Sequence, residues 1–562
     1  MNTLCDFIPT TIKEAEAQGI SAFDVIIVSA DAYVDHPAFA AAVIGRYLQG
    51  LGLEVGIISQ PDWKSIKDFT ALGKPRLFFG VTAGNLDSMV SLYTAQRKIR
   101  SGDPYTENGI GGRRPYLPTV VYTNRLKEAF KGVPVIIGGI EVSLRRIAHY
   151  DYYTDKVKSS ILLDSKADML VYGNGEAPLK EIISRYRSGA SLDQMRDIRG
   201  TALIIKGSQK AVLPGKIQHL PPYEQVKNDK SAFNLMTSVL FSNLNPYSAQ
   251  PLYQEAGTRG VLINPPAFPL NTAELDDVYA FPFKRQAHPR YKGKIPALDM
   301  IRHSITSHRG CYGGCSFCSL YMHQGKIVQS RSAESIKNEI MDMAAADNRK
   351  IIITDVGGPT ANMYGTFCKD KKFEKKCKRK SCLYPLVCRN LNTSHKDYRL
   401  LLKKIRKLPC VKKAYINSGI RCDLALLDKQ FIKEAVMYYT QGQLSIAPEH
   451  CSPEVLKIMN KPDIKIYEEF IKLFQREKNK AKKKHLLAPY FIVAHPGADA
   501  DTEADLKKYM HRNRVSVKQL QEFYPTPMTI ATAIYYTGMD PETGRNIRVE
   551  RRPGIKKKWK RI

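Results

Sequence analysis

Hydrophobic and polar positions alternate along residues 1–209 in blocks typical of an α/β protein. The apolar run FDVIIVSA, residues 23–30, is followed by a helix-like stretch that ends near Leu48 and by a second run within GLGLEVGIIS. Further short apolar runs lie at residues 76–82, 134–139 and 167–176. Short buried runs separated by helical segments predict parallel strands with helices on both faces. We therefore expect residues 1–209 to form a Rossmann-like domain.

The pattern degrades over residues 210–296, where proline and aromatic residues interrupt it. Segments such as LPPYEQ, NPPAFPL and AFPFKRQAHPRY show no sustained helical or strand period. Proline and glycine mark turns and loops. We expect this part to be a connector that wraps the surface, and not a domain.

A second alternating series occupies residues 297–530. It predicts strands at 302–310, 351–358, 411–419, 443–449, 487–497 and 517–525. Helices are predicted at 332–346, 395–408, 428–439, 463–484 and 501–513, with Ser332 as a cap and Pro453 in a first helical turn. Six strand–helix repeats predict a partial (β/α)6 barrel of the TIM type, in which loops at the strand carboxyl ends carry the chemistry. Residues 531–562 read as a basic C-terminal extension.

The cysteines are distributed unevenly. Of the eleven, Cys5 stands alone and the other ten lie from Cys311 to Cys451. The first residues lack the pattern of a signal peptide, and no run of about 18 uncharged apolar residues is present. We therefore expect a cytoplasmic protein without a membrane partner. In that compartment clustered cysteines are more often metal ligands than members of disulfides.

Three cysteines follow the first predicted barrel strand in the segment CYGGCSFC. Cys311, Cys315 and Cys318 have the spacing C-x3-C-x2-C, and Gly313 and Gly314 free the backbone to curl. Three thiolates can hold an iron–sulfur cube and leave one iron open for a cofactor or substrate. The alternative is that the three cysteines are buried or bind zinc.

This spacing resembles the hallmark of the radical S-adenosylmethionine (SAM) superfamily. The resemblance implies a [4Fe-4S] cluster whose open iron chelates the amino and carboxylate groups of SAM, with Phe317 beside the adenine. Gly357 and Gly358, in DVGGPTANMY, resemble the glycine pair whose backbone meets the SAM amino group.

Three later motifs come in the order that this superfamily has. INSGIRCDL offers Ser418 and Arg421 for contacts with the ribose or the carboxylate of SAM. SIAPEHCSPEVLKIMNKP offers the carboxylate of Glu449, and FIVAHPGADADTEADL resembles the strand, turn and helix that follow. Taken singly, each of these motifs is also compatible with an ordinary turn.

Longer motifs resemble the YgiQ family of radical SAM proteins over nearly the whole chain. They are SADAYVDHPAFA, PVIIGGIEVSLRR, MLVYGNGE and FYPTPMTIATAIYYTGMDP. The resemblance implies a cobalamin-binding-like N-terminal domain joined to a radical SAM barrel, and it does not imply a substrate.

Cobalamin is a candidate cofactor of such a domain. Related families often ligate cobalt through an Asp-x-His-x-x-Gly loop, whose spacing is absent around Asp35, His36 and Pro37. His36 is alternatively a residue at a helix start. The glycines at positions 138, 139, 173 and 175 either line a cofactor cleft or allow tight turns.

A second cysteine set lies in a basic insertion at residues 366–390. Cys368, Cys377, Cys382 and Cys388 can close a full ligand set around zinc or a second iron–sulfur cluster, although their spacing fits neither common zinc pattern. The alternative is free or partly paired thiols. The remaining cysteines are expected to pack as small apolar groups, and they are Cys410, Cys422 and Cys451.

The formal net charge is +32, which favours a polyanionic partner such as RNA. Residues 369–380 hold eight bases and two acids, and residues 545–562 hold nine bases and one acid. A solvated, solubilising face is the alternative.

The leading hypothesis is a radical SAM enzyme that receives an electron from a donor such as flavodoxin or ferredoxin. It would cleave SAM and start radical chemistry on an RNA nucleoside or a small metabolite. The alternative is a non-catalytic iron–sulfur or zinc protein that binds nucleic acid through its basic segments.

Overall fold

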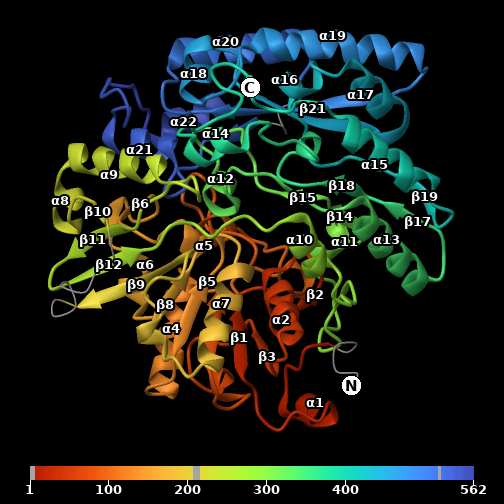
Figure 1. Ribbon diagram of the computed structural model, residues 1–562. Helices are drawn as coiled ribbons and strands as arrows, with labels where there is room; N and C mark the ends of the chain where they lie inside the picture. Colours follow the sequence, from red (N-terminus) through yellow and green to blue (C-terminus); the bar gives the residue numbers. More distant parts are fainter. Residues whose placement is uncertain (1–6, 207–215, 517–519, 562) are drawn as a thin grey trace. The chain divides into compact units, whose positions relative to one another are not determined.

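The computed structural model describes residues 7–206, 216–516 and 520–561 (Figure 1). Cys5 and the predicted boundary at residue 209 therefore lie outside the described residues. The chain forms two compact units, Met1–Phe268 with Asp277–Arg302, and Pro269–Asp276 with His303–Ile562. Among the described helices, none combines the length and the apolar composition that a membrane span requires.

The first unit is built on a nine-stranded sheet in the order β10-β11-β12-β9-β8-β5-β4-β1-β3. Its strands are β1 (Val25–Ser29), β3 (Val55–Ser59), β4 (Phe78–Thr82), β5 (Val135–Gly138), β8 (Met169–Val171), β9 (Thr201–Lys206), β10 (Gln218–His219), β11 (Leu252–Ala256) and β12 (Arg259–Ile263). The neighbours β3, β1, β4, β5 and β8 are parallel, and the order reverses at β1. This is a doubly wound sheet of the flavodoxin-like order, so the predicted Rossmann-like fold is confirmed.

Helices cover both faces of this sheet. On one face α2 and α7 pack together, and on the other face α4 packs against β4, β5 and α6. The helices of this unit are α1 (Ile12–Ala17), α2 (Ala40–Gly50), α3 (Ser88–Leu92), α4 (Pro118–Ala129), α5 (Ile140–Ser143), α6 (Ile161–Ser165), α7 (Glu176–Arg187), α8 (Tyr223–Asn228), α9 (Lys230–Ser242) and α11 (Pro296–Ile301). The short pairs β2 (Val34–Asp35) with β13 (Gln286–Ala287), and β6 (His149–Asp151) with β7 (Lys156–Lys158), complete it. The unit boundary falls inside α10 (Thr272–Tyr279).

The segment predicted as a connector is instead largely part of this unit. It contains α8, α9 and the strands β10, β11 and β12, which extend the sheet from β9. The hairpin of β11 and β12 turns at Gly257, whose φ is +58°. The prediction of a surface connector was wrong here because proline-rich flanks hid two short apolar runs.

The second unit contains parallel strands in chain order. They are β14 (Ser304–Thr306), β17 (Ile351–Ile353), β18 (Asp355–Gly357), β19 (Val411–Ala414), β20 (Gln443–Glu449), β21 (Leu486–Val493) and β22 (Leu520–Glu522). β14 pairs with β18 and β17 pairs with β19, both in parallel. β21 lies between β20 and β22 and is parallel to both. A parallel bridge joins Ile420 to Ile446. The predicted strand at 351–358 is thus present as two consecutive segments. The strand predicted at 517–525 is described only from residue 520.

Helices alternate with these strands, as Figure 1 shows for α13, α15 and α19. They are α12 (Ser319–Gln324), α13 (Ala333–Asp347), α14 (Lys371–Lys376), α15 (Lys396–Lys407), α16 (Cys422–Ala425), α17 (Lys429–Glu434), α18 (Pro453–Ile458), α19 (Ile464–Lys480), α20 (Ala500–Arg512), α21 (Ile530–Thr537) and α22 (Pro553–Lys560). The small pair β15 (His308–Arg309) and β16 (Gln329–Ser330) completes the unit. Ser332 caps α13 by accepting from the Ser335 amide, and Pro453 is the first residue of α18, as predicted.

The C-terminal segment is more than an exposed basic extension. Lys556, in α22, is buried and pairs with Glu522 of β22 at 3.2 Å. Trp559 packs against the core of the second unit. The segment therefore contributes to folding, although Lys557, Lys558 and Lys560 remain exposed.

Candidate active site

The loop with the first three cysteines follows β15 and depends on its glycines. Gly310 has φ +85°, and a Cβ there would lie 2.1 Å from the carbonyl oxygen of Ile327. Gly314 has φ +62°, and a Cβ there would lie 2.7 Å from the carbonyl oxygen of Lys380. Gly313 is not left-handed, but a Cβ there would lie 2.9 Å from Nη1 of Arg421. Glycine is required where φ is positive or where backbone approaches closely.

Backbone hydrogen bonds fix the three cysteines. The Cys311 amide donates to the Gly325 carbonyl at 3.0 Å, and the Cys318 amide donates to the Cys315 carbonyl at 3.2 Å. Between them, the Ser316 amide donates to the Met459 carbonyl at 3.1 Å. Because Cys318 also begins α12, the loop is anchored at both ends.

The three thiols lie within electrostatic reach of one another. Burial, and then the charges of Cys315 and Cys311, raise the pKa of Cys318 to about 12. Burial and then Cys315 likewise raise the pKa of Cys311. Nη1 of Arg421 donates to Sγ of Cys315 at 3.5 Å and so places a positive charge beside the loop. The arrangement gathers three thiols and one cation.

Thiolate ligands can surround either a single ion or a cluster. Among the described residues, no three His, Cys, Asp or Glu side chains converge closely enough to ligate one metal ion. In an iron–sulfur cube each thiolate binds a different iron, so its ligands surround a volume instead of a point.

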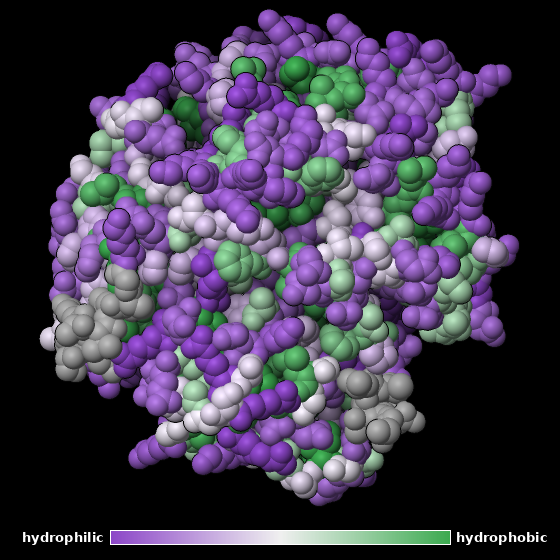
Figure 2. All heavy atoms as spheres, viewed as in Figure 1, coloured by the Kyte–Doolittle hydropathy of each residue, from purple (hydrophilic) through white to green (hydrophobic). Residues whose placement is uncertain are grey.

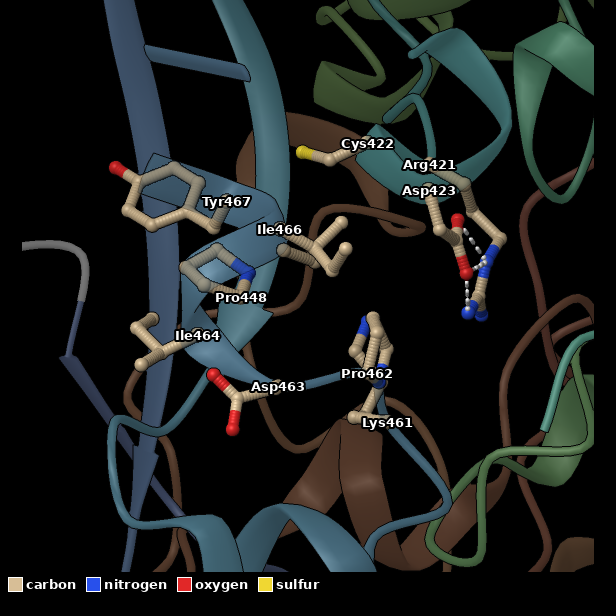
Figure 3. A pocket seen from close by; sticks show the side chains of 11 residues that line it. Arg421, Cys422, Asp423, Pro448, Lys461, Pro462, Asp463, Ile464, Ile466 and Tyr467 are labelled. Atoms are coloured by element: carbon tan, nitrogen blue, oxygen red, sulfur yellow. Dashed lines mark hydrogen bonds and ion pairs between the residues drawn. The ribbon is translucent and has the colours of Figure 1, made fainter. Parts of the chain in front are cut away.

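Arg421 is itself held rigidly. Its Nη2 donates to Oδ2 of Asp423 at 2.6 Å and its Nε to Oδ1 at 3.0 Å, a fork geometry that favours guanidinium–carboxylate pairs. The Arg421 amide donates to Oδ1 of Asn362 at 2.9 Å, and Nδ2 of Asn362 donates back to the Arg421 carbonyl at 3.0 Å. Figure 3 shows this pair on one wall of a pocket, across from Lys461.

Glu449 belongs to the same charged group. It ends β20 with φ +73°, and its Oε1 lies 3.7 Å from Nζ of Lys461. Burial raises the pKa of Glu449, whereas the charges of Lys461 and Arg421 lower it. The structure thus brings together the predicted residues Arg421, Glu449 and Cys315, with Asp423 and Lys461 added.

Gly357, Gly358 and Ser418 lie in a second group beside the same strands. The Ser418 amide donates to Oδ1 of Asp355 at 3.0 Å, and its hydroxyl donates to Oδ2. A Cβ on Gly357 would lie 2.2 Å from Oγ of Ser418, and one on Gly358 would lie 2.7 Å from the ring of His308. The two glycines therefore permit close packing, and the Ser418 hydroxyl is already committed to Asp355.

Phe317 lies in a third group. Its ring packs with Met459 and meets the His495 ring edge to face at 5.9 Å. Burial lowers the pKa of His450 to about 4 and that of His495 to about 3, so both rings are neutral at neutral pH. Among the described residues, neither His450 Nε2 nor His495 Nε2 has a hydrogen-bond partner.

The other ring nitrogens assign the tautomers of these histidines. Nδ1 of His450 accepts from the Ser452 amide at 3.0 Å, so its Nε2 carries a hydrogen. Nδ1 of His495 faces the Pro496 carbonyl at 2.9 Å and must donate, so its Nε2 is an acceptor. His495, which contacts Phe317, thus leaves a buried acceptor, and His450, within electrostatic reach of His495, leaves a buried donor. The edge of an adenine offers both complementary groups.

Sequence reasoning missed Asp423, Asn362, Lys461, His450 and His495. Lys461 and His450 lie within the motif SIAPEHCSPEVLKIMNKP, and His495 lies within FIVAHPGADADTEADL. The motifs therefore marked the region, but only the tertiary structure shows which side chains face the site.

The second cysteine set packs beside the first loop. Burial raises the pKa of Cys382 to about 11, with Lys326 opposing and Cys388 adding to the shift. The Cys382 amide donates to the Tyr312 carbonyl at 3.0 Å. None of the ten described cysteines forms a disulfide. As predicted, the three remaining cysteines pack against the core of the unit, and they are Cys410, Cys422 and Cys451.

The carboxyl edge of the first unit's sheet is filled by its own side chains. Nη2 of Arg114 bonds Asp31 at 2.9 Å and Nε of Arg114 bonds Asp103 at 2.6 Å, all three being buried. Both ring nitrogens of His36 are occupied, by the Ala38 amide at 3.0 Å and by Arg285 at 3.0 Å. The residues at this edge therefore do not fit a histidine-ligated cobalamin.

The glycines at this edge are explained by backbone conformation and close packing. Gly139 has φ +96° and Gly173 has φ +76°. A Cβ on Gly139 would lie 2.6 Å from Oγ1 of Thr82, and one on Gly175 would lie 3.3 Å from Ile44. Tight turns and close packing account for them.

Comparison with known proteins identifies the chain's family. Residues 7–304 match the model "Radical SAM N-terminal", residues 305–509 match "Radical SAM superfamily", and residues 518–561 match "Domain of unknown function (DUF3362)".

Relatives and solved structures agree with these models. The UPF0313 protein YgiQ of Escherichia coli K12 is 44% identical over 95% of this chain and 80% of the relative. A UPF0313 protein of Rhodopseudomonas palustris is 46% identical over 96% of this chain and 82% of the relative. The structure of the radical SAM methyltransferase TsrM from Kitasatospora setae aligns with a TM-score of 0.51 at 15% identity, over 90% of this chain and 75% of that one, which shows a shared fold. The chain therefore belongs to the YgiQ (UPF0313) family of the radical SAM superfamily.

Proposed function

We propose that this enzyme reductively cleaves SAM at a [4Fe-4S] cluster held by Cys311, Cys315 and Cys318. The observation that carries the proposal is the loop of three partly buried thiols with Nη1 of Arg421 3.5 Å from Sγ of Cys315. Family membership implies the cluster and SAM, and it argues against the non-catalytic alternative. We expect a cytoplasmic setting, because such thiols need a reducing compartment, and an electron donor such as flavodoxin or ferredoxin.

The residues of the second unit fit these cofactors. When bound, the cluster and SAM supply the electron transfer and the radical chemistry. Arg421 and Lys461 offer positive charge for a carboxylate, and Glu449 offers negative charge for an ammonium group. Phe317, with the unpaired Nε2 atoms of His450 and His495, offers a surface and two hydrogen bonds for the adenine. Burial of these groups excludes water, which strengthens each interaction.

The test is cleavage of SAM by the full chain, purified and reconstituted without oxygen. With dithionite, the wild type should release 5'-deoxyadenosine, measured by liquid chromatography and mass spectrometry. Cys315→Ala should abolish the product, whereas Cys410→Ala, at a cysteine outside the loop, should leave it unchanged. A reconstituted cluster that neither binds nor cleaves SAM would overturn the proposal.

The contribution of His450 to adenine binding can be measured separately. His450→Ala removes the unpaired donor and should weaken SAM binding by about tenfold, as the loss of one buried hydrogen bond of about 1–1.5 kcal/mol requires. Unchanged affinity in equilibrium dialysis would exclude His450 from the adenine site.

We further propose that the substrate is an RNA nucleoside. The net charge is +32, and the exposed lysines of the insertion are Lys369, Lys371, Lys372, Lys375, Lys376 and Lys378. The face in Figure 2 is mostly hydrophilic, with hydrophobic residues in small separate patches. Lysine-rich surfaces attract phosphate and release counterions on binding.

The test of RNA binding uses substitution and not truncation, because Lys556 and Trp559 pack inside the unit. Binding of total tRNA should weaken steeply with salt, and K557Q/K558Q/K560Q should reduce the slope of log K against log salt. The matched variant K482Q/K483Q/K484Q removes three exposed lysines of another segment. Binding that does not depend on salt would refute the RNA proposal and favour a small metabolite.

Cobalamin is not assigned a role. A structure of TsrM was solved with cobalamin and a [4Fe-4S] cluster bound. In the present chain His36 is committed to Arg285, and Arg114 with its two carboxylates fills the sheet edge. No step is therefore derived through cobalamin.

A further inference from the structure

The insertion after β18 gathers four thiols that SAM cleavage does not use. The Cys388 amide donates to the Cys382 carbonyl at 2.8 Å, which closes the loop between these two cysteines. Cys368 forms an antiparallel bridge with Leu391, whose amide donates to the Cys388 carbonyl at 2.9 Å. The two ends of the insertion thus meet, and Cys368 is brought beside Cys388.

Electrostatic contacts connect the remaining thiols. Cys382 lies within reach of the charges of Cys377 and Cys388, and Cys368 lies within reach of Cys388. These contacts link all four cysteines into one group.

Two cations accompany this group. Nζ of Lys326 lies 3.9 Å from Sγ of Cys377 and donates to the Arg379 carbonyl at 2.8 Å. The positive charges of Lys326 and Arg379 both lie within electrostatic reach of the Cys382 thiol. A four-thiolate metal centre carries net negative charge, and burying such a charge is costly unless cations offset it. The cations therefore suit ligated thiolates better than neutral thiols.

We propose that Cys368, Cys377, Cys382 and Cys388 hold a second iron–sulfur cluster, because the four thiols are grouped but do not converge on a single point as the ligands of one zinc ion would. Four protein ligands complete the coordination of such a centre and leave no open position for SAM. The centre is therefore structural or electron-transferring, and it is distinct from the cluster of the three-cysteine loop.

The position of the insertion shows what this centre would stabilise. Oγ of Ser381 donates to the Gly313 carbonyl at 2.7 Å, and the Cys382 amide donates to the Tyr312 carbonyl at 3.0 Å. The Tyr321 hydroxyl donates to the Lys380 carbonyl at 2.9 Å. Residues 380–382 thus brace the three-cysteine loop, and a metal bound beside them would hold the brace in place.

The test is metal content, which does not depend on SAM cleavage. The full chain with C311A/C315A/C318A lacks the first ligand set, and it would be reconstituted anaerobically with Fe²⁺ and sulfide. We expect about four iron atoms per chain, measured by elemental analysis after gel filtration. A C382S/C388S variant should lose that metal and keep about four iron atoms in the first site.

The control is C410S/C451S, because both cysteines pack against the core and lie outside both sets. It should keep the full metal content. If C382S/C388S does not fold, Cys368→Ser alone, at a partly exposed thiol, should speed metal loss to a chelator. A folded C311A/C315A/C318A chain that binds no iron would overturn the inference, as would an unchanged iron content in C382S/C388S.

Discussion

Substitution of Gly310 by alanine tests how tightly the three-cysteine loop is packed. Gly310 precedes Cys311, has φ +85°, and would place a new Cβ 2.1 Å from the Ile327 carbonyl oxygen. Gly325 is a matched control in the same region, because its φ is +78° but nothing lies within 4 Å of a Cβ there. Both substitutions place a non-glycine residue at a positive φ. Only Gly310→Ala also brings a Cβ into collision with the Ile327 carbonyl oxygen.

The two costs can be separated in size. A left-handed φ costs a non-glycine residue about 1–2 kcal/mol, which is the whole expected effect of Gly325→Ala. Forcing an extra methyl group into packed surroundings adds about 1–3 kcal/mol. Gly310→Ala should therefore be less stable than Gly325→Ala by about 1–3 kcal/mol, or roughly 3–9 °C in Tm at about 3 °C per kcal/mol for a unit of this size.

The assay is thermal unfolding of both variants, followed by circular dichroism, together with iron retained per chain after gel filtration. Gly310→Ala should also lose iron, because relief of the collision moves the backbone next to Cys311. Equal Tm values and equal iron for the two variants would refute the reasoning, since they would mean that the loop relaxes without cost.

Three further outcomes follow from the same unit. Ser381→Ala removes the hydrogen bond to the Gly313 carbonyl, so stability should fall by about 1–3 kcal/mol and iron should be lost faster to a chelator; unchanged retention would contradict the brace. Arg421→Gln leaves the buried carboxylate of Asp423 unpaired and should cost about 3–5 kcal/mol in denaturant unfolding, with Arg421→Lys recovering part of the loss. Burial raises the pKa of Glu503 to about 8, so the folded chain holds a proton that the unfolded chain releases, and stability should fall as pH rises from about 4.5 to 8. Glu503→Gln should remove that slope from a series of Tm measurements, and an unchanged slope would assign it to another group.

Much of the fold could be predicted because its signals are local. The strand predicted at 443–449 coincides with β20, and the helix predicted at 395–408 differs from α15 by one residue at each end. Buried runs, the Ser332 cap and the proline at position 453 are each read from a few neighbouring residues. The parallel arrangement of the strands was expected from their alternation with helices.

The errors came from segments where composition hid a local pattern. LYQEA and RGVLI, around Gly257, are strand-like runs separated by a turn, and they form β11 and β12. Proline-rich neighbours on the C-terminal side made the segment look irregular. In the same way, the bases of residues 545–562 suggested an exposed extension, whereas one of them, Lys556, is buried against Glu522.

The site shows a different limit. The cysteine loop could be found because its three ligands lie within eight residues. The pairing of Glu449 with Lys461, and the unpaired nitrogens of His450 and His495, depend on how separate strands and turns meet. Sequence spacing carries no information on which of these atoms lacks a partner.

The direction in which the basic residues point changes the meaning of the net charge. Arg421 faces Cys315, Lys326 faces Cys377, and Lys556 faces Glu522, so part of the excess charge offsets buried thiols and carboxylates inside the second unit. These bases are not available to a polyanion. The charge that can meet RNA is that of the exposed bases, which is why the RNA test changes Lys557, Lys558 and Lys560 and leaves the buried bases in place. The basic residues behind the formal charge of +32 therefore have two separate roles. Some offset thiols and carboxylates within the fold, and the exposed ones can attract a partner.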